Sequence, residues 1–171
     1  KACSATIADM GYAWTITVGA PGLPVYSFTD DDVIVSKSQT LDPFPSLSET
    51  YNAVSARYPA PKDLYETREA PLRTNGSAEA SDAFGRRTAS LTLPAAPYGG
   101  QVQRLTRAWL NDERRFIRHI LNLPPDASAV ELTDTMDWTS GRNGYQNKVF
   151  SVSEISEDVR TGIRQFSTRE R

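Results

Sequence analysis

The clearest hydrophobic pattern in the chain predicts an amphipathic helix at about residues 100–115. Val102, Leu105, Ala108 and Trp109 recur at the spacing of one helical face, while most of the other positions are polar. This spacing indicates a helix that packs one apolar stripe against the rest of the fold.

Alternation of polar and apolar residues predicts strands in much of the remaining sequence. In the last third, three such segments are joined by short turns, one of which holds the typical hairpin pair Asn143-Gly144. We expect these three strands to form an antiparallel meander, and a fourth strand near 117–123 to pair with it. The predicted fold class is therefore α+β and β-rich, an antiparallel β-barrel with one packed helix and an N-terminal hairpin. The predicted strands lie near 51–58, 64–71, 86–93, 117–123, 130–139, 145–155 and 159–167.

The N-terminal segments predict elements outside this barrel. Residues 1–10 are typical of the end of a helix. Strand-like runs at 12–18 and 24–28 flank a Gly/Pro turn, which predicts a β-hairpin. Residues 36–49 contain two prolines and four serines, so we interpret them as an extended connector.

These segments divide the chain into two predicted parts. Residues 1–47 are interpreted as the end of a preceding α+β module, with the helix end, the hairpin and the connector. Residues 48–171 are interpreted as a β-barrel domain that includes the helix at about 100–115. Because the first residue is Lys1 rather than methionine, we expect the chain to be part of a longer polypeptide.

Composition excludes several classes of function. The 171 residues (18.9 kDa) include 19 Lys and Arg against 21 Asp and Glu, which gives a formal net charge of −2. This balance excludes a nucleic-acid binder that depends on net positive charge. One cysteine, Cys3, and one histidine, His119, allow neither an intramolecular disulfide nor a metal site with two imidazoles. No stretch approaches the roughly 20 apolar residues of a membrane-spanning helix.

His119 and the acidic residues are the groups that catalysis or metal binding would use. His119 lies on the apolar side of a strand-like run without a nucleophile signature, which favours a half-buried histidine over a general base. Asp30-Asp31-Asp32 favours an acidic turn over a calcium loop, because Val35 and Leu41 stand where such a loop needs Gly and Glu. We therefore predict no catalytic, metal-binding or cofactor-binding residue, no cofactor and no enzyme activity. The sequence also contains two carboxylate pairs, Glu66 with Glu69 and Asp134 with Asp137. Glycoside hydrolysis requires a particular distance between two carboxylates, and sequence alone does not give that distance.

Arginines and aromatic residues are the candidates for binding. A cationic run along and after the predicted helix has two interpretations, a lining of a DNA channel or an ordinary solvated face. Trp14, Trp109 and Trp138 favour core or subunit contacts over a ligand platform. Asn75-Gly-Ser77 matches a glycosylation acceptor and is typical of a turn. The cationic run comprises Arg104, Arg107, Arg114, Arg115 and Arg118.

Five short motifs follow one another in an informative order. They are Thr29-Asp-Asp-Asp-Val-Ile34, Tyr51-Asn-Ala-Val-Ser-Ala-Arg-Tyr-Pro59, Gln103-Arg-Leu-Thr-Arg-Ala-Trp-Leu110, Trp138-Thr-Ser-Gly-Arg-Asn-Gly-Tyr145 and Phe150-Ser-Val-Ser-Glu154. In this order they resemble the tail hub and tip attachment proteins of long-tailed bacteriophages, and most of all the large tail proteins of gene transfer agents and related prophages. The sequence departs from this family at Thr133, where a Leu-x-x-Gly-Asp turn would have glycine.

The resemblance implies hub-type β-barrel domains arranged in a ring, usually a homotrimer in the full-length protein. Such a ring joins the tail tube to the distal tip of the virion and surrounds the channel through which DNA leaves. The implied partners are other phage tail proteins, namely the distal tail, tail tube or tape measure proteins, while an isolated fragment is compatible with a monomer. No catalytic residue is implied.

Three functions remain to be separated. The leading hypothesis is a structural module of a phage or prophage tail hub or tip, which acts by protein–protein contact. The alternative is a tail-tip module that binds a host-surface glycan through Trp14 or Trp138. A cell-wall hydrolase that uses His119 or a carboxylate pair is the third and least favoured hypothesis.

Overall fold

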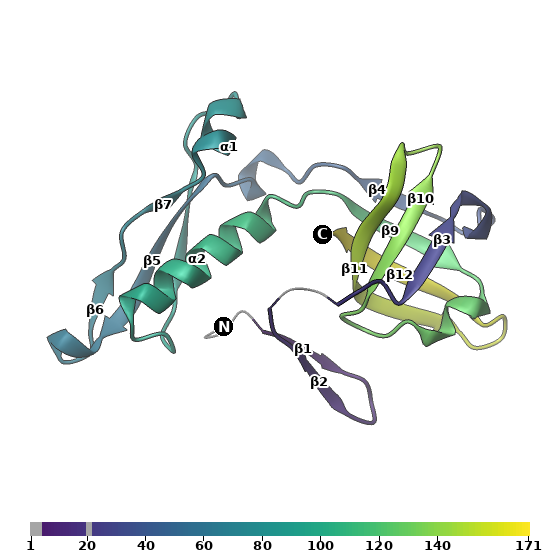
Figure 1. Ribbon diagram of the computed structural model, residues 1–171, viewed down its shortest axis with the longest axis horizontal. Helices are drawn as coiled ribbons and strands as arrows, with labels where there is room; N and C mark the ends of the chain where they lie inside the picture. Colours follow the sequence, from purple (N-terminus) through teal and green to yellow (C-terminus); the bar gives the residue numbers. More distant parts are fainter. Residues whose placement is uncertain (1–4, 20–21) are drawn as a thin grey trace. The chain divides into compact units, whose positions relative to one another are not determined.

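The computed structural model describes residues 5–19 and 22–171, which form two compact units. Pro45–Arg114 belong to the first unit, and Thr6–Phe44 together with Arg115–Arg171 form the second (Figure 1). The predicted boundary between residues 47 and 48 lies near the point where the chain passes from the second unit into the first. The division into domains at that boundary stays a prediction, and the predicted range 48–171 includes strands of both units.

The second unit is built on one six-stranded sheet, in the order β3-β10-β11-β12-β9-β4 (Figure 1). The predicted meander is confirmed: β10, β11 and β12 are antiparallel neighbours, and β9 pairs with β12. β3 adds to β10 in parallel, and β4 adds to β9. The strands are β3 (Tyr26–Thr29), β4 (Thr40–Asp42), β9 (Arg118–Leu123), β10 (Thr135–Ser140), β11 (Tyr145–Asp158) and β12 (Ile163–Glu170).

This sheet curves around a single hydrophobic core. β11 is 14 residues long, and its pairing with β12 shifts register between Val152 and Glu154, a bulge that bends the strand. The two short 3-10 helices η1 (Asp30–Asp32) and η4 (Pro125–Ala129) flank the sheet. The largest fully buried core side chains come from β9, β10, β11 and β12, and include Leu123, Met136, Trp138, Phe150 and Phe166.

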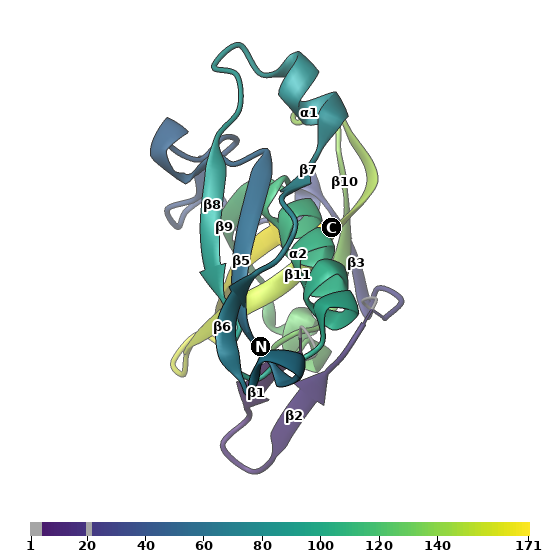
Figure 2. The ribbon, with the colours of Figure 1, turned by 90° about the vertical axis from the view of Figure 1, so that its left-hand side faces the viewer.

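The first unit packs helix α2 (Gly99–Glu113) on a four-stranded sheet, with α1 (Gly76–Ser81) nearby (Figure 2). The predicted helix is therefore confirmed, but its buried face is turned from the predicted stripe: Val102, Thr106 and Leu110 are buried, whereas Ala108 is exposed. Val102 and Leu110 pack against residues of β5 and β8 and the segments next to them. The strands are β5 (Ala53–Ala60), β6 (Glu66–Glu69), β7 (Arg73–Thr74) and β8 (Thr88–Thr92), and the 3-10 helices are η2 (Leu47–Glu49) and η3 (Pro61–Asp63).

The prediction that all these strands share one barrel is wrong. β5 and β8 pair with each other in parallel and form a core with α2, whereas the meander has a core of its own. In the described residues no sheet is closed, since β3 and β4 stand at the two ends of the six-stranded sheet. Alternation identifies strands and their buried faces, but it does not identify their partners.

Asn52 fixes the loops at one end of the first unit. Its side chain is fully buried and donates hydrogen bonds to Asp82 Oδ2 (3.0 Å) and to the Gly85 carbonyl (2.8 Å). Its Oδ1 accepts the Arg87 N–H at 2.7 Å, so that this buried side chain makes three hydrogen bonds to the loops. Asp82 also binds Arg114 through two bonds of 2.9 and 3.0 Å. Burial opposes ionisation of Asp82, but the hydrogen bonds from Arg114 and Asn52 lower its pKa.

The N-terminal segment differs from its prediction. The expected helix end at residues 1–10 is wrong where it can be seen, because Thr6–Asp9 form strand β1; residues 1–4 lie outside the described residues. β1 pairs with β2 (Trp14–Thr17), so the hairpin lies one strand earlier than predicted. Gly11, at φ 80°, supplies the left-handed turn between them. The predicted second strand is β3, which joins the sheet instead; the turn residues 20 and 21 lie outside the described residues.

Candidate interaction surface

The β1–β2 hairpin turns an apolar face outward. Ile7 and Ile16 are cross-strand partners, and Trp14 lies two residues before Ile16 on the same face. Ile7 is 60% exposed, Ile16 62% and Trp14 71%. On the other face Ala8 is buried, so the hairpin is apolar on the side that meets solvent.

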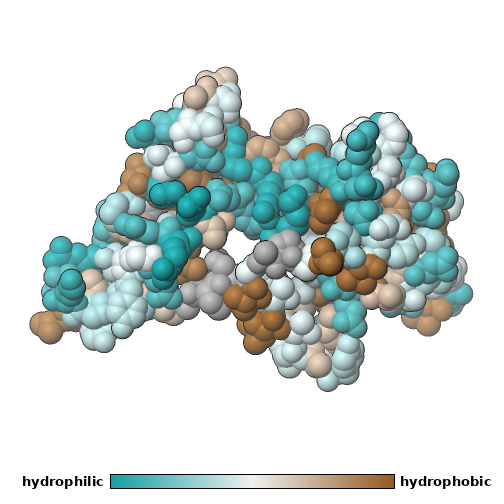
Figure 3. Space-filling view, viewed as in Figure 1, coloured by the Kyte–Doolittle hydropathy of each residue, from teal (hydrophilic) through white to brown (hydrophobic). Residues whose placement is uncertain are grey.

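Two hydrogen bonds fix which face of the hairpin turns outward. The hydroxyls of Thr17 and Thr133 are 3.0 Å apart, and the Tyr12 hydroxyl donates to Glu131 Oε1 at 2.8 Å. The hydrogen bond to Glu131, followed by the charge of that carboxylate, raises the pKa of Tyr12. Both contacts tie the hairpin to the loop before β10, so the apolar face stays solvent-exposed in this chain. Brown, apolar side chains are visible on the hairpin in Figure 3, at the lower centre of the view.

His119 is a structural residue of the second unit's core. It is only 5% exposed, and its ring lies 4.9 Å from that of Trp138 and 5.3 Å from that of Phe150. Its Nε2 is 3.0 Å from the Tyr145 hydroxyl, and its side chain is more deeply buried than the half-buried histidine that the sequence predicted. Burial, and then the positive charge of Lys148, lowers the pKa of His119 to about 4. A neutral, aromatic-packed histidine fits the structural interpretation.

A small pocket lies beside His119. Its volume is about 200 Å³, and neither a carboxylate nor a nucleophilic cysteine or serine lines it. No group of three or more His, Cys, Asp and Glu residues in the described part of the chain is placed to hold a metal ion. The lining residues are Gln39, Thr40, Leu41, His119, Ile120, Leu121, Trp138, Arg142 and Asn143.

The aspartates at 30–32 form a turn, as predicted. They make the 3-10 helix η1, and Asp32 Oδ2 accepts hydrogen bonds from the N–H and the hydroxyl of Thr29 at 2.8 and 3.0 Å. Asp30 accepts the N–H of Arg142 at 3.2 Å. A hydrogen bond from Ser140, together with this N–H, lowers the pKa of Asp30. The carboxylates thus serve the turn and the loop after β10.

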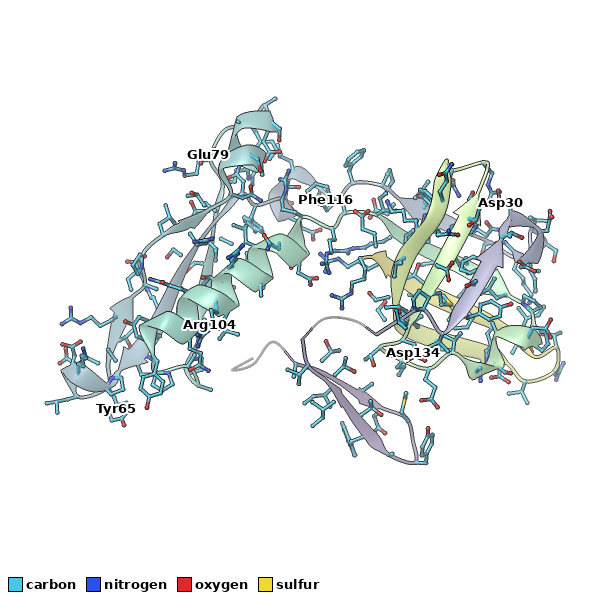
Figure 4. All side chains as sticks on the ribbon, viewed as in Figure 1. Asp30, Tyr65, Glu79, Arg104, Phe116 and Asp134 are labelled. Atoms are coloured by element: carbon cyan, nitrogen blue, oxygen red, sulfur yellow. The ribbon has the colours of Figure 1, made fainter. Side chains whose placement is uncertain are left out.

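The predicted cationic run is divided between the two units. Arg114 is held by Asp82 in the first unit, while the Arg115 carbonyl accepts a hydrogen bond from Arg169 in the second. Arg104 and Arg107 project from the exposed side of α2, where Figure 4 labels Arg104. Within the first unit, Arg104 and Arg107 form a short basic face on α2.

The remaining candidates take local structural roles. Asn75 Oδ1 caps α1 by accepting the Ala78 N–H at 3.2 Å. Trp109 packs on Tyr51 with ring centres 6.1 Å apart, and Trp138 is 1% exposed, so neither presents a ligand platform. Three of the four paired carboxylates accept local hydrogen bonds: Glu69 from the Ser55 hydroxyl, Asp134 from the Glu131 N–H, and Asp137 from the Ser27 hydroxyl. The fourth, Glu66, lies exposed on β6.

Sequence reasoning missed the outward direction of Ile7 and Ile16. The alternation of Trp14, Ile16 and Val18 with threonines is visible in the sequence, but it fits a strand with either face buried. The direction depends on the bonds from Tyr12 and Thr17 to residues more than 110 positions away.

Comparison with known proteins places the chain among phage tail proteins. A family model described as putative phage tail protein matches residues 8–155. The chain belongs to this family of phage tail proteins. No curated protein has a sequence that matches this tail protein. No helix in its described residues is long and apolar enough to cross a membrane.

Several solved structures share the fold of this tail protein. One is a chain of the virion of a native gene transfer agent particle, with 14% identity, a TM-score of 0.67, and coverage of 91% of this chain and 33% of that one. Another is the 43 kDa tail protein of prophage MuSo2 from Shewanella oneidensis, with 11% identity, a TM-score of 0.61, and coverage of 96 and 50%. The tail protein from Neisseria meningitidis MC58 gives 11% identity, a TM-score of 0.55, and coverage of 92 and 48%. This chain therefore spans a third to a half of the length of these proteins.

Proposed function

We propose that this chain is a structural module of a phage or prophage tail hub or tip protein. It links the tail tube to the distal tip by protein–protein contacts around the DNA channel. Family membership and the shared fold support a place in the virion tail. The observation that carries a role in contact rather than chemistry is the outward apolar face of Ile7, Trp14 and Ile16, held in place by bonds to the loop before β10.

The proposal also covers the partners and the oligomeric state of the module. The partners are the distal tail, tail tube or tape measure proteins, and the full-length polypeptide forms a homotrimeric ring at the tail tip. The isolated chain is a monomer, because ring contacts that it shares with other domains are too small to hold it in a ring alone. We assign the curved six-stranded sheet to the hub-type barrel, and we assign the chain no enzymatic role.

Binding of a host-surface glycan is the second candidate function. Trp14 and Tyr12 are 71 and 77% exposed on the hairpin, and exposed aromatic rings are what a sugar-binding surface needs. Trp138 is excluded as a glycan contact because it is buried in the core. Binding on a glycan array that disappears with Trp14→Ala would favour this function over a subunit contact.

Assembly of particles by variants of the full-length polypeptide tests the structural proposal. Trp14→Ser combined with Ile16→Ser removes two of the three side chains of the apolar face without touching a buried side chain, so the protein should fold normally. We expect at least a tenfold decrease in complete tails counted by electron microscopy. Val159→Ser is the matched control, because Val159 is 90% exposed in the turn between β11 and β12. Equal numbers of complete tails for the double variant and the control would contradict the proposal.

A further inference from the structure

The two edges of the first unit's sheet differ in charge. β8 pairs with β5 alone, so its outer side has no neighbouring strand in the described part of the chain (Figure 2). At the opposite edge, β6 carries Glu66, Arg68 and Glu69, the kind of residues that prevent edge strands from pairing. β8 reads Thr-Ala-Ser-Leu-Thr and has no charge. An open and uncharged edge is a place where a further strand can add.

The apolar surface beside β8 is incompletely covered. Ala89 is buried under α2, but Leu91 and Trp109, which pack against the same cluster, are only half-buried. A strand added at β8 would cover these side chains if its own apolar residues pointed to the side of α2.

Strand β2 has the properties that this edge requires. Its outer edge is unpaired in the described residues, because the β1–β2 sheet has two strands. It has four residues against five in β8, no charge, and exposed Trp14 and Ile16 alternating with threonines. A two-stranded sheet is marginal by itself, and it gains stability from further strands.

We propose that β2 of one copy of this chain pairs in parallel with β8 of a second copy. In this register Trp14 lies beside Ala89, Ile16 beside Leu91 and Val18 beside Leu93. The large ring of Trp14 then covers the small side chain of Ala89, and all of these apolar residues lie on the side of the sheet that faces α2. We choose the parallel direction because it brings Asp9, the cross-strand partner of Trp14, to the same end of the sheet as Arg87.

This pairing is heterologous, because it joins two different surfaces of the same chain. Repetition of such a contact with the right rotation closes a ring. The inference rests on the proposed function, since it supplies the contact between neighbouring subunits of the proposed hub.

Disulfide cross-linking between two differently tagged full-length chains tests the pairing. In a cysteine-free background that includes Cys3→Ala, one chain carries Thr15→Cys and the other carries Ser90→Cys. In the proposed pairing, residues 15 and 90 lie side by side on the face of the sheet away from α2, close enough for a disulfide to form. We expect mild oxidation of co-assembled particles to give a covalent dimer that holds both tags. Thr17→Cys with Thr92→Cys, in the same register, is the second pair.

The control replaces Ser90→Cys by Thr67→Cys, on the charged edge formed by β6. Equal cross-linking in the control, or assembled particles without any cross-link from either pair, would overturn the pairing. A disulfide that forms only when both cysteines are on one chain would overturn it as well. If the Trp14→Ser, Ile16→Ser variant blocks assembly while no cross-link forms, the proposed function stands and this pairing is wrong.

Discussion

His119 gives the second unit a pH dependence of its own in weakly acidic solution. The pKa of His119 is lowered from 6.5 to about 4 in the folded protein. Between these two pH values the imidazole is therefore protonated in the unfolded chain but neutral in the folded protein. The free energy of unfolding should therefore decrease as the pH falls from 6.5 towards 4. We expect His119→Gln to remove this decrease between pH 7 and 5, measured by urea denaturation.

Asp30 and Asp82 do not obscure this measurement. Hydrogen bonds lower the pKa values of Asp30 and Asp82 below 3.8, so the stability they contribute is lost only at more acidic pH. A slope between pH 7 and 5 that is the same in the parent and in His119→Gln would contradict the assignment of a neutral, buried imidazole.

Thr133 occupies a backbone conformation that favours glycine. Its φ is 72°, and a β-branched residue is strained there. Glycine is the residue that the resemblance led us to expect here, and threonine in its place adds strain to the turn. In a Thr17→Val background, which already lacks the hydroxyl pair, we expect Thr133→Gly to raise the free energy of unfolding by about 0.5–1 kcal/mol. Chemical denaturation measures this, and a decrease would show that the turn is not strained.

At the scale of elements, α2 holds the first unit together. Leu110 is 2% exposed and packs on Val54 and Ala89 of the sheet. We expect Leu110→Ala to destabilise this unit by about 2–4 kcal/mol. Hydrogen exchange should become faster in β5 and β8, while β10 to β12, which have a separate core, keep their protection.

Arg104→Ala is the matched control on the same helix, because Arg104 is exposed and its loss should change stability by less than about 0.5 kcal/mol. Faster exchange throughout β10 to β12 in Leu110→Ala would contradict the independence of the two cores.

The elements differ in how far the sequence predicts them. The stripe of Val102, Leu105 and Trp109 determines a helix, and alternation finds every strand of the meander, because each follows from the period of one segment. The partners of β3 and β5 were not predictable, since parallel pairing joins segments with a long intervening chain. For the same reason, the residues of the apolar face could be named, but its outward direction could not.

At the scale of the whole molecule, each unit supplies a different contact surface in the proposed assembly. The second unit presents the apolar hairpin, and the first unit offers the uncharged edge of β8. The loop between β5 and β6, where Figure 4 labels Tyr65, adds exposed apolar side chains at Leu64 and Tyr65. Exposed groups of this kind on both units suit a chain that works inside an assembly.

The central claim, a place in the tail hub, is tested most directly by electron cryomicroscopy of purified particles. The full-length polypeptide would carry a fused marker domain, and particles with unmarked protein would be the control. We predict extra density in a ring with threefold repetition between the tail tube and the distal tip. Marker density along the tube or at the capsid, or tails without any marker, would contradict the account.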